Sequence, residues 1–131
     1  MKVIVVGPRG KMGKLITQIA AARDDMELVA GVAPAGRDYI GQDLGQAAMV
    51  GRMLGVPVVD DLESVIDDCD VIIDFSTKEM GMKVLELAVA HEKALVCGTT
   101  GFSAEEMQRF KDAAQKIPML YAANTSKLVN V

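Results

Sequence analysis

The chain has 131 residues, of which 50% are hydrophobic and 24% are charged, and its formal net charge is −4 at pH 7. This composition is typical of one folded globular domain and unlike that of a disordered chain. The negative net charge and the scattered basic residues argue against a nucleic-acid partner. No apolar stretch approaches the roughly 20 residues that span a bilayer, so we expect no membrane contact. We also expect no signal peptide, because the chain enters a strand at once.

Few residues of the sequence are suited to metal or acid–base chemistry. Cys69 and Cys97 lack the spacing of a metal or redox motif, so we expect buried thiols in a reducing cytoplasm, and no metal site. The single histidine, His91, falls at the end of a predicted helix. There we expect it to complement the helix dipole rather than to act in catalysis.

The first predicted element is the apolar strand Val3–Val6, and a glycine-rich turn follows it directly. The turn runs Gly7-Pro8-Arg9-Gly10-Lys11-Met12-Gly13 and opens a helix predicted over Lys11–Ala22, with an apolar stripe of Leu15, Ile16, Ile19 and Ala20. A strand, a glycine turn and a helix in this order form an anion site, because backbone N–H groups and the helix N-terminus both face the ligand. A P-loop is excluded, since Leu15 follows Lys14 where that motif needs Ser or Thr. The pattern therefore predicts the pyrophosphate site of NAD(P).

Strand-like and helix-like segments alternate along the rest of the chain. Further strands are predicted at Leu28–Val32, Val56–Val59, Val71–Phe75, Ala94–Cys97 and Met119–Tyr121. Helices are predicted at Leu62–Asp67 (capped by Asp61), at Thr77–His91, and from a capping box at Ser103 to about Lys116, with a short helix expected within Pro34–Gly55. Six strands with intervening helices predict a single-domain α/β fold: a doubly wound parallel sheet of the Rossmann type, in the order 3-2-1-4-5-6.

In such a sheet, ligands bind outside the carboxyl ends of the strands. Small or hydroxyl-bearing residues follow the strands in the segments 7–13, 33–37, 75–77, 98–101 and 122–126. Turns often have this composition for local reasons, but several of them on one edge favour a ligand site. Phe75 is expected to pack on the nicotinamide or its ribose.

The end of the second strand bears on the choice of cofactor. An NAD-selective site usually has Asp or Glu there, whereas this chain has Ala33 and Pro34. Arg37 follows closely, and Arg9 and Lys11 lie in the glycine turn. These cations favour NADPH over NADH, although the same three residues are also explained as ordinary solvated charges.

Five blocks of sequence resemble the dihydrodipicolinate reductase family in content and order. They are residues 7–13, Gly41-Gln42-Asp43-Leu44-Gly45, Ile73-Asp74-Phe75-Ser76, Gly98-Thr99-Thr100-Gly101-Phe102 and Ala122-Ala123-Asn124. The resemblance is to the N-terminal, cofactor-binding domain and covers nearly the whole chain. The last two blocks make it more specific than the glycine turn alone.

The resemblance implies a cofactor site along the whole carboxyl edge. The residues of Gly7 to Met12 would hold the pyrophosphate, the end of the second strand would select the cofactor, and two later turns would bracket the nicotinamide, with Thr100 also near the substrate. The cofactor-binding residues expected in all are Gly7, Pro8, Arg9, Gly10, Lys11, Met12, Gly13, Ala33, Arg37, Phe75, Ser76, Gly98, Thr99, Thr100, Ala122, Ala123, Asn124 and Thr125. The family, as full-length homotetramers, reduces a cyclic dicarboxylate of lysine and diaminopimelate biosynthesis by hydride transfer from NADPH or NADH.

The chain departs from the family's pattern in three places. The family usually has an acidic residue where Ala33 stands, and the run after Asn124 differs from the usual one. The family's second domain, with its substrate motif and tetramer interface, is absent. We therefore expect no catalytic residue in this chain and no efficient catalysis by it alone.

Two other functions remain open from the sequence. One is a stand-alone NAD(P)-binding or sensing module without catalysis. The other is a different oxidoreductase with the same half-domain, such as a relative of homoserine or semialdehyde dehydrogenases. The blocks at 98–102 and 122–124 favour the dihydrodipicolinate reductase family over this last alternative.

Overall fold

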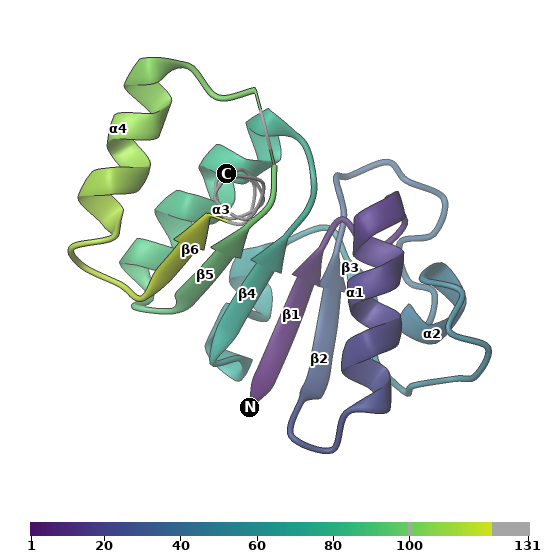
Figure 1. Cartoon of the computed structure of the whole chain (residues 1–131). Helices are drawn as coiled ribbons and strands as arrows, with labels where there is room; N and C mark the ends of the chain where they lie inside the picture. The colour runs from purple at the N-terminus through teal and green to yellow at the C-terminus, as the bar shows by residue number, and fades with distance from the viewer. Residues whose placement is uncertain (100, 122–131) are drawn as a thin grey trace, which may run out of the picture.

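The computed structural model describes residues 1–99 and 101–121, which form one parallel sheet with helices on both faces (Figure 1). The strands are β1 (Lys2–Val6), β2 (Glu27–Val32), β3 (Val58–Val59), β4 (Val71–Asp74), β5 (Ala94–Cys97) and β6 (Met119–Tyr121). The helices are α1 (Lys11–Ala22), α2 (Leu44–Ala47), α3 (Lys78–Ala90) and α4 (Ala104–Ala113), with two 3₁₀ turns, η1 (Leu62–Ser64) and η2 (Ile66–Asp68). The strand order is β3-β2-β1-β4-β5-β6, and every pairing is parallel, which confirms the predicted topology.

The central strand β1 shows why its sequence is continuously apolar. Ile4 and Val6 pack into the core beneath α3, α4 and the 3₁₀ turns, whereas Val3 and Val5 pack into the core beneath α1 and α2. All four side chains are completely buried. Because helices cover both faces of a parallel sheet, neither face of the strand requires polar residues.

Helix α1 has the predicted bounds, but its buried face differs from the predicted stripe. Gly13, Thr17 and Ala20 face the sheet, while Leu15 and Ile19 are each 48% exposed. The small residues let the helix axis approach the strands closely, and the hydroxyl of Thr17 donates to the carbonyl of Gly13 at 2.7 Å rather than remaining unpaired in the core. The prediction that Leu15 and Ile19 belong to the buried face is therefore wrong. The helix packs so close to the sheet that only small side chains fit between them.

Several boundaries also differ from those predicted. The segment 62–67 forms two 3₁₀ turns instead of one helical turn, although the carboxylate of Asp61 caps η1 as expected, accepting from the amide of Glu63 at 3.1 Å. Strand β3 is shorter than predicted, because Pro57 forms an isolated antiparallel bridge with Asp43 of the preceding loop. The capping box at Ser103 and the short helix within 34–55 are both confirmed.

The long connection between β2 and β3 is organised by the carboxylate of Asp43. Its Oδ2 atom accepts from the amides of Gly45 and Leu54, both at 2.8 Å, and its Oδ1 atom accepts from the amide of Val56 at 3.0 Å. Partial burial raises the pKa of Asp43, but the backbone donors outweigh this effect and hold the pKa below its usual value. One ionised side chain therefore satisfies three backbone amides, one in α2 and two in the segment that precedes β3.

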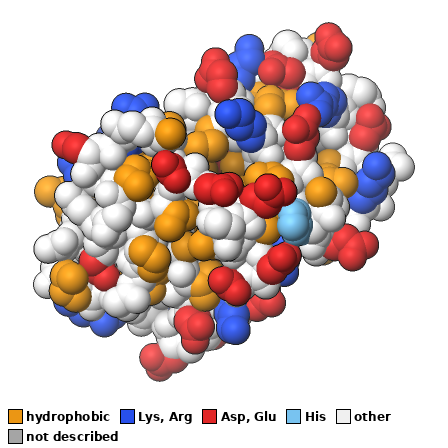
Figure 2. Space-filling model, turned by 180° about the vertical axis from the view of Figure 1, so that it is seen from behind, with side chains coloured by type: hydrophobic (Ala, Val, Ile, Leu, Met, Phe, Trp, Pro, Cys, Tyr) orange, Lys and Arg blue, Asp and Glu red, His pale blue; other side chains and the backbone are white. Residues whose placement is uncertain are grey.

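The cysteines and the histidine lie where the sequence suggested. Cys69 and Cys97 are free and buried, and burial raises the pKa of each thiol to about 11. His91 ends α3, and its Nδ1 atom lies 2.9 Å from a carboxylate oxygen of Asp67 on η2; Figure 2 shows the histidine among acidic side chains. Within the described residues, no helix is long and apolar enough to cross a bilayer.

Replacing Asp43 with Ala should destabilise the chain by about 2 kcal/mol or more, because three backbone amides lose their acceptor. Since the pKa of Asp43 is lowered in the fold, its contribution is complete above the usual Asp pKa and is lost as the pH falls through the folded value. Urea unfolding at neutral and acidic pH measures both effects, with Asp24→Ala in an exposed turn as the control. Equal stability of parent and Asp43→Ala at neutral pH would contradict this role.

Candidate functional site

The glycine turn lies at the carboxyl end of β1 and is bonded to the strands on either side. The amide of Gly7 donates to the carbonyl of Val32 at the end of β2, at 2.9 Å. The amide of Phe75, just after β4, donates to the carbonyl of Val6 at 3.1 Å. All strands point the same way, so these ends share one edge of the sheet (Figure 1). That edge is where the sequence predicted a ligand.

Two of the three glycines in the turn are required by the protein's own packing. Gly7 has a φ of +82°, and a Cβ atom there would lie 2.9 Å from the carbonyl oxygen of Phe75. A Cβ atom on Gly13 would lie 1.8 Å from the carbonyl oxygen of Gly7, where no side chain fits. At Gly10, by contrast, a Cβ atom would meet only carbonyl oxygens at 3.5 and 3.7 Å, which is ordinary contact. The packing of the protein on itself therefore does not require glycine at position 10.

The N-terminus of α1 is built differently from those of α3 and α4. Helices α3 and α4 begin with side-chain caps, from Thr77 and Ser103, whereas Gly10 supplies none and the first turn of α1 has no acidic residue. Among the described residues, the first amide of α1 that donates to a backbone carbonyl is that of Lys14, to Gly10 at 2.8 Å. Uncapped amides at a helix N-terminus bind anions, and the helix dipole adds to the attraction.

The predicted cations lie around this turn and the loop that follows β2. The guanidinium of Arg9 lies 5.2 Å from the centre of the Tyr39 ring, which brings the glycine turn and that loop together. Arg37 belongs to the same loop, and Lys11 begins α1. Within the described part of the chain, none of the three cations forms an ion pair with a carboxylate.

The residue that ends β2 contributes packing rather than a polar contact. Ala33 is completely buried, and its amide donates to the carbonyl of Val59 in β3 at 3.0 Å. Its methyl group belongs to the core beneath α1 and α2. No carboxylate therefore projects from this position.

The end of β4 carries a buried acid that the sequence did not single out. Asp74 is completely buried, and its Oδ1 atom accepts from both the amide of Ser76, at 2.9 Å, and the Ser76 hydroxyl. Its Oδ2 atom has no hydrogen-bond partner among residues 1–99 and 101–121. Burial raises the pKa of Asp74, and the two bonds from Ser76 only partly oppose the rise. The spacing Asp-x-Ser at a strand end was the available signal, since an acid there can accept from the residue two positions on.

The turn after β5 packs directly on the turn after β4. The amide of Gly98 donates to the carbonyl of Asp74 at 2.8 Å, and the Thr99 hydroxyl donates to the carbonyl of Ser76 at 3.3 Å. A Cβ atom on Gly98 would lie 1.9 Å from a ring carbon of Phe75, so the ring covers the glycine. The structure therefore brings together the predicted residues Phe75, Ser76, Gly98 and Thr99. The other predicted residues, Thr100, Ala122, Ala123, Asn124 and Thr125, lie outside the described residues.

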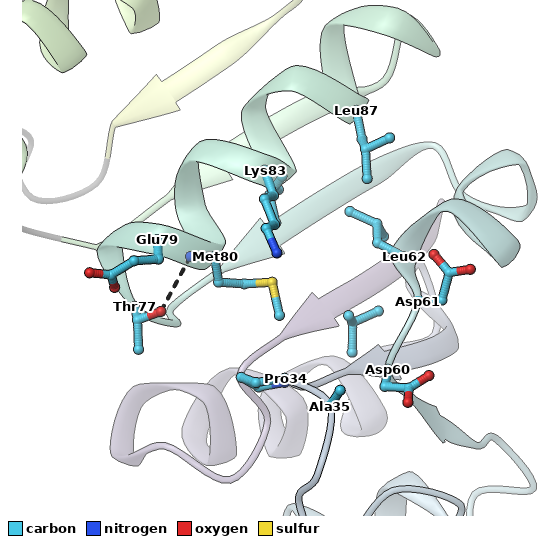
Figure 3. A pocket seen from close by; sticks show the side chains of 12 residues that line it. Pro34, Ala35, Asp60, Asp61, Leu62, Thr77, Glu79, Met80, Lys83 and Leu87 are labelled. Carbon is cyan, nitrogen blue, oxygen red and sulfur yellow. Dashed lines mark hydrogen bonds between the residues drawn. The ribbon is translucent and has the colours of Figure 1, made fainter.

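A pocket of about 350 Å³ adjoins the end of β2 on the α3 side of the sheet (Figure 3). It is lined by Val32, Pro34, Ala35, Asp60, Asp61, Leu62, Thr77, Glu79, Met80, Lys83, Val84 and Leu87. Most of its walls are apolar, and its charged lining residues are Asp60, Asp61, Glu79 and Lys83. Of its lining residues, the sequence predicted only those in the loop after β2 and Thr77 after β4 as part of a ligand site. The residues of α3 could not be predicted, because only the tertiary fold brings them to the pocket.

The comparisons with known proteins agree with this architecture. Residues 1–125 match the family model for the N-terminus of dihydrodipicolinate reductase. The chain is 38% identical over 131 residues to the 4-hydroxy-tetrahydrodipicolinate reductase of Burkholderia vietnamiensis, covering 100% of this chain and 49% of that protein. It is 41% identical over 130 residues to that of Desulfotalea psychrophila, covering 99% and 48%. The dipicolinate-bound dihydrodipicolinate reductase of Paenisporosarcina sp. TG-14 superposes with a TM-score of 0.67 at 33% identity, covering 87% of this chain and 43% of that one.

The sheet order and the glycine turn define a Rossmann-type domain of the kind found in nicotinamide-dependent reductases. The chain belongs to the family of dihydrodipicolinate reductase N-terminal domains. It spans about half the length of the curated relatives that it matches. Fold and family together support a nicotinamide cofactor, without distinguishing NADPH from NADH.

The stability of the parent should fall as the pH rises and Asp74 ionises. The Asp74→Asn variant should not show this fall. Because the pKa of Asp74 is raised, its protonated form is favoured in the fold; the stability is complete below the usual value of 3.8 and is lost as the pH rises through the folded value. Asn keeps an oxygen for the Ser76 donors and never ionises. Urea unfolding of both proteins across this range measures the difference. Parallel stability–pH curves would show that Asp74 does not titrate in this way.

Proposed function

We propose that this chain is the cofactor-binding half of a reductase acting on 4-hydroxy-tetrahydrodipicolinate or a closely related cyclic dicarboxylate, in lysine and diaminopimelate biosynthesis. The observation that carries the proposal is the uncapped N-terminus of α1 beside Gly10, in a chain of this family. Family membership favours this function over a stand-alone sensing module. The nicotinamide supplies a hydride when it is bound.

The roles of the described residues follow from their positions. Within the segment Gly7 to Met12, the amides of Lys11 and Met12 at the start of α1 would hold the pyrophosphate, because the helix dipole adds to their attraction. Phe75, Ser76, Gly98 and Thr99 would form the surface beneath the nicotinamide ring, because their turns are bonded to one another at the next strand ends. The Phe75 ring is its apolar part, and its two hydroxyl groups donate within the protein, from Ser76 to the Asp74 carboxylate and from Thr99 to the Ser76 carbonyl.

Residues outside the described range complete the proposed site through the family resemblance. Ala122, Ala123, Asn124 and Thr125 would contact the nicotinamide side, and Thr100 would lie near both cofactor and substrate. The proton donor and most substrate contacts would come from a second domain of the family, and the full-length protein would be a homotetramer. We place the activity in the cytoplasm, which is supported by two buried, unpaired cysteines.

Gly10→Val should weaken binding of both reduced cofactors at least about tenfold, because its side chain would occupy the space where phosphate meets backbone. The fold should tolerate the change, since a Cβ atom there makes only ordinary contacts and the φ of −68° suits any residue. Fluorescence titration with NADPH and NADH measures affinity, and thermal unfolding verifies the fold. Gly10→Ala serves as the smaller step. Unchanged affinity in folded Gly10→Val would overturn the pyrophosphate assignment.

We further propose that NADPH binds more tightly than NADH. Ala33 offers no carboxylate to repel a 2′-phosphate, and Arg37, with Arg9 and Lys11 nearby, has no ion-pair partner among the described residues. Arg37→Ala should narrow the difference between the two affinities, and higher ionic strength should do the same. The same titrations provide the measurement, and a clear preference of the parent for NADH would refute the proposal.

A further inference from the structure

The pocket beside β2 contains one cation whose charged group is directed inward. Figure 3 shows the amine of Lys83 reaching from α3 into the pocket, while the carboxylates of Asp60, Asp61 and Glu79 point away from its centre. The Asp61 carboxylate already accepts from the amide of Glu63. Among the described residues, Lys83 has neither an ion pair nor a side-chain hydrogen bond. The pocket therefore presents an unpaired positive charge.

The remaining walls suit a flat aromatic base rather than a second charged group. Leu62 and Met80 point into the pocket from opposite sides (Figure 3). Leu87, also on α3, lines one end of the pocket. Pro34 and Ala35, at the start of the loop after β2, form the opposite rim. An apolar slot with one convergent cation matches a nucleobase that carries a nearby phosphate.

The loop after β2 connects this pocket with the residues proposed to select the cofactor. Pro34 and Ala35 lie only a few positions before Arg37, which follows on the same loop. A phosphate on an adenosine ribose at this rim would lie between Lys83 of α3, which lines the pocket, and the loop that carries Arg37. Lysine suits such a position, because its flexible stem delivers a compact charge to a phosphate.

Building on the proposed function, we propose that Lys83 is a specificity-determining residue that binds the adenosine 2′-phosphate of NADPH from the α3 side of this pocket. It acts together with Arg37 and independently of the glycine turn. The acidic residues that line the rim do not cancel its effect, because their carboxylates point away from the centre of the pocket toward solvent, which screens them.

Lys83→Met tests this assignment, because methionine keeps the apolar stem and removes the charge. Binding of NADPH should weaken by about tenfold, as expected for a charge-assisted contact, whereas binding of NADH should change by less than about twofold. Adenosine 2′,5′-bisphosphate and 5′-AMP, which lack the nicotinamide, should show the same contrast. Lys83→Arg should retain the preference, and Lys111→Met on the exposed face of α4 is the matched control.

The outcomes separate this inference from the proposed function. Equal losses for NADPH and NADH, or no change for either, would overturn the role of Lys83 while leaving the glycine turn intact. Failure of the folded parent to bind either cofactor would overturn both proposals. Loss of NADPH preference in Lys83→Met, with full binding of NADH and an unchanged melting temperature, would establish the role of Lys83. A merely structural defect would weaken the binding of both ligands.

Discussion

Three turns at the carboxyl edge of the sheet approach one another so closely that backbone atoms and one aromatic ring take the place of side chains. Gly7 lies against the carbonyl of Phe75, Gly13 lies against the carbonyl of Gly7, and Gly98 lies beneath the Phe75 ring. Each contact is too short for a Cβ atom. The direction of α1 and the spacing of the strand ends depend on these approaches, and so does the shape of the surface they form.

This constraint changes how the glycine motif is interpreted. Gly7 and Gly13 are explained by the packing of the chain on itself, and they would be required even without a ligand. Gly10 has no such internal reason, since a Cβ atom there would make only ordinary contacts. The part of the motif that the protein does not need is therefore the part that points to a phosphate. A glycine pattern in a sequence combines these two causes, and only the contacts separate them.

Much of the fold follows from local sequence, while the site depends on tertiary contacts. The strands were predictable because runs such as Val3–Val6 are apolar and β-branched throughout, as buried parallel strands must be. The exposure of Leu15 and Ile19 was not predictable, because the distance between α1 and the sheet decides which side chains fit between them. Likewise, the burial of Asp74 and the direction of Lys83 arise from elements far apart in the chain, for which periodicity carries no signal.

In the proposed preference for NADPH, the absence of a repelling carboxylate would be combined with several weak attractions from cations. The methyl group of Ala33 removes the carboxylate that would repel a 2′-phosphate, but it attracts nothing. In this proposal the attraction would come from Arg37 and Lys83, which are exposed to solvent. Each exposed charge pair is worth about 0.2–1 kcal/mol with a singly charged partner. A phosphate dianion and direct hydrogen bonds raise that value. Because the cations come from different elements, discrimination requires the loop after β2 and α3 to keep their relative position. The packed edge of the sheet would supply that rigidity, so the same close contacts that shape the glycine turn would also support the proposed choice of cofactor.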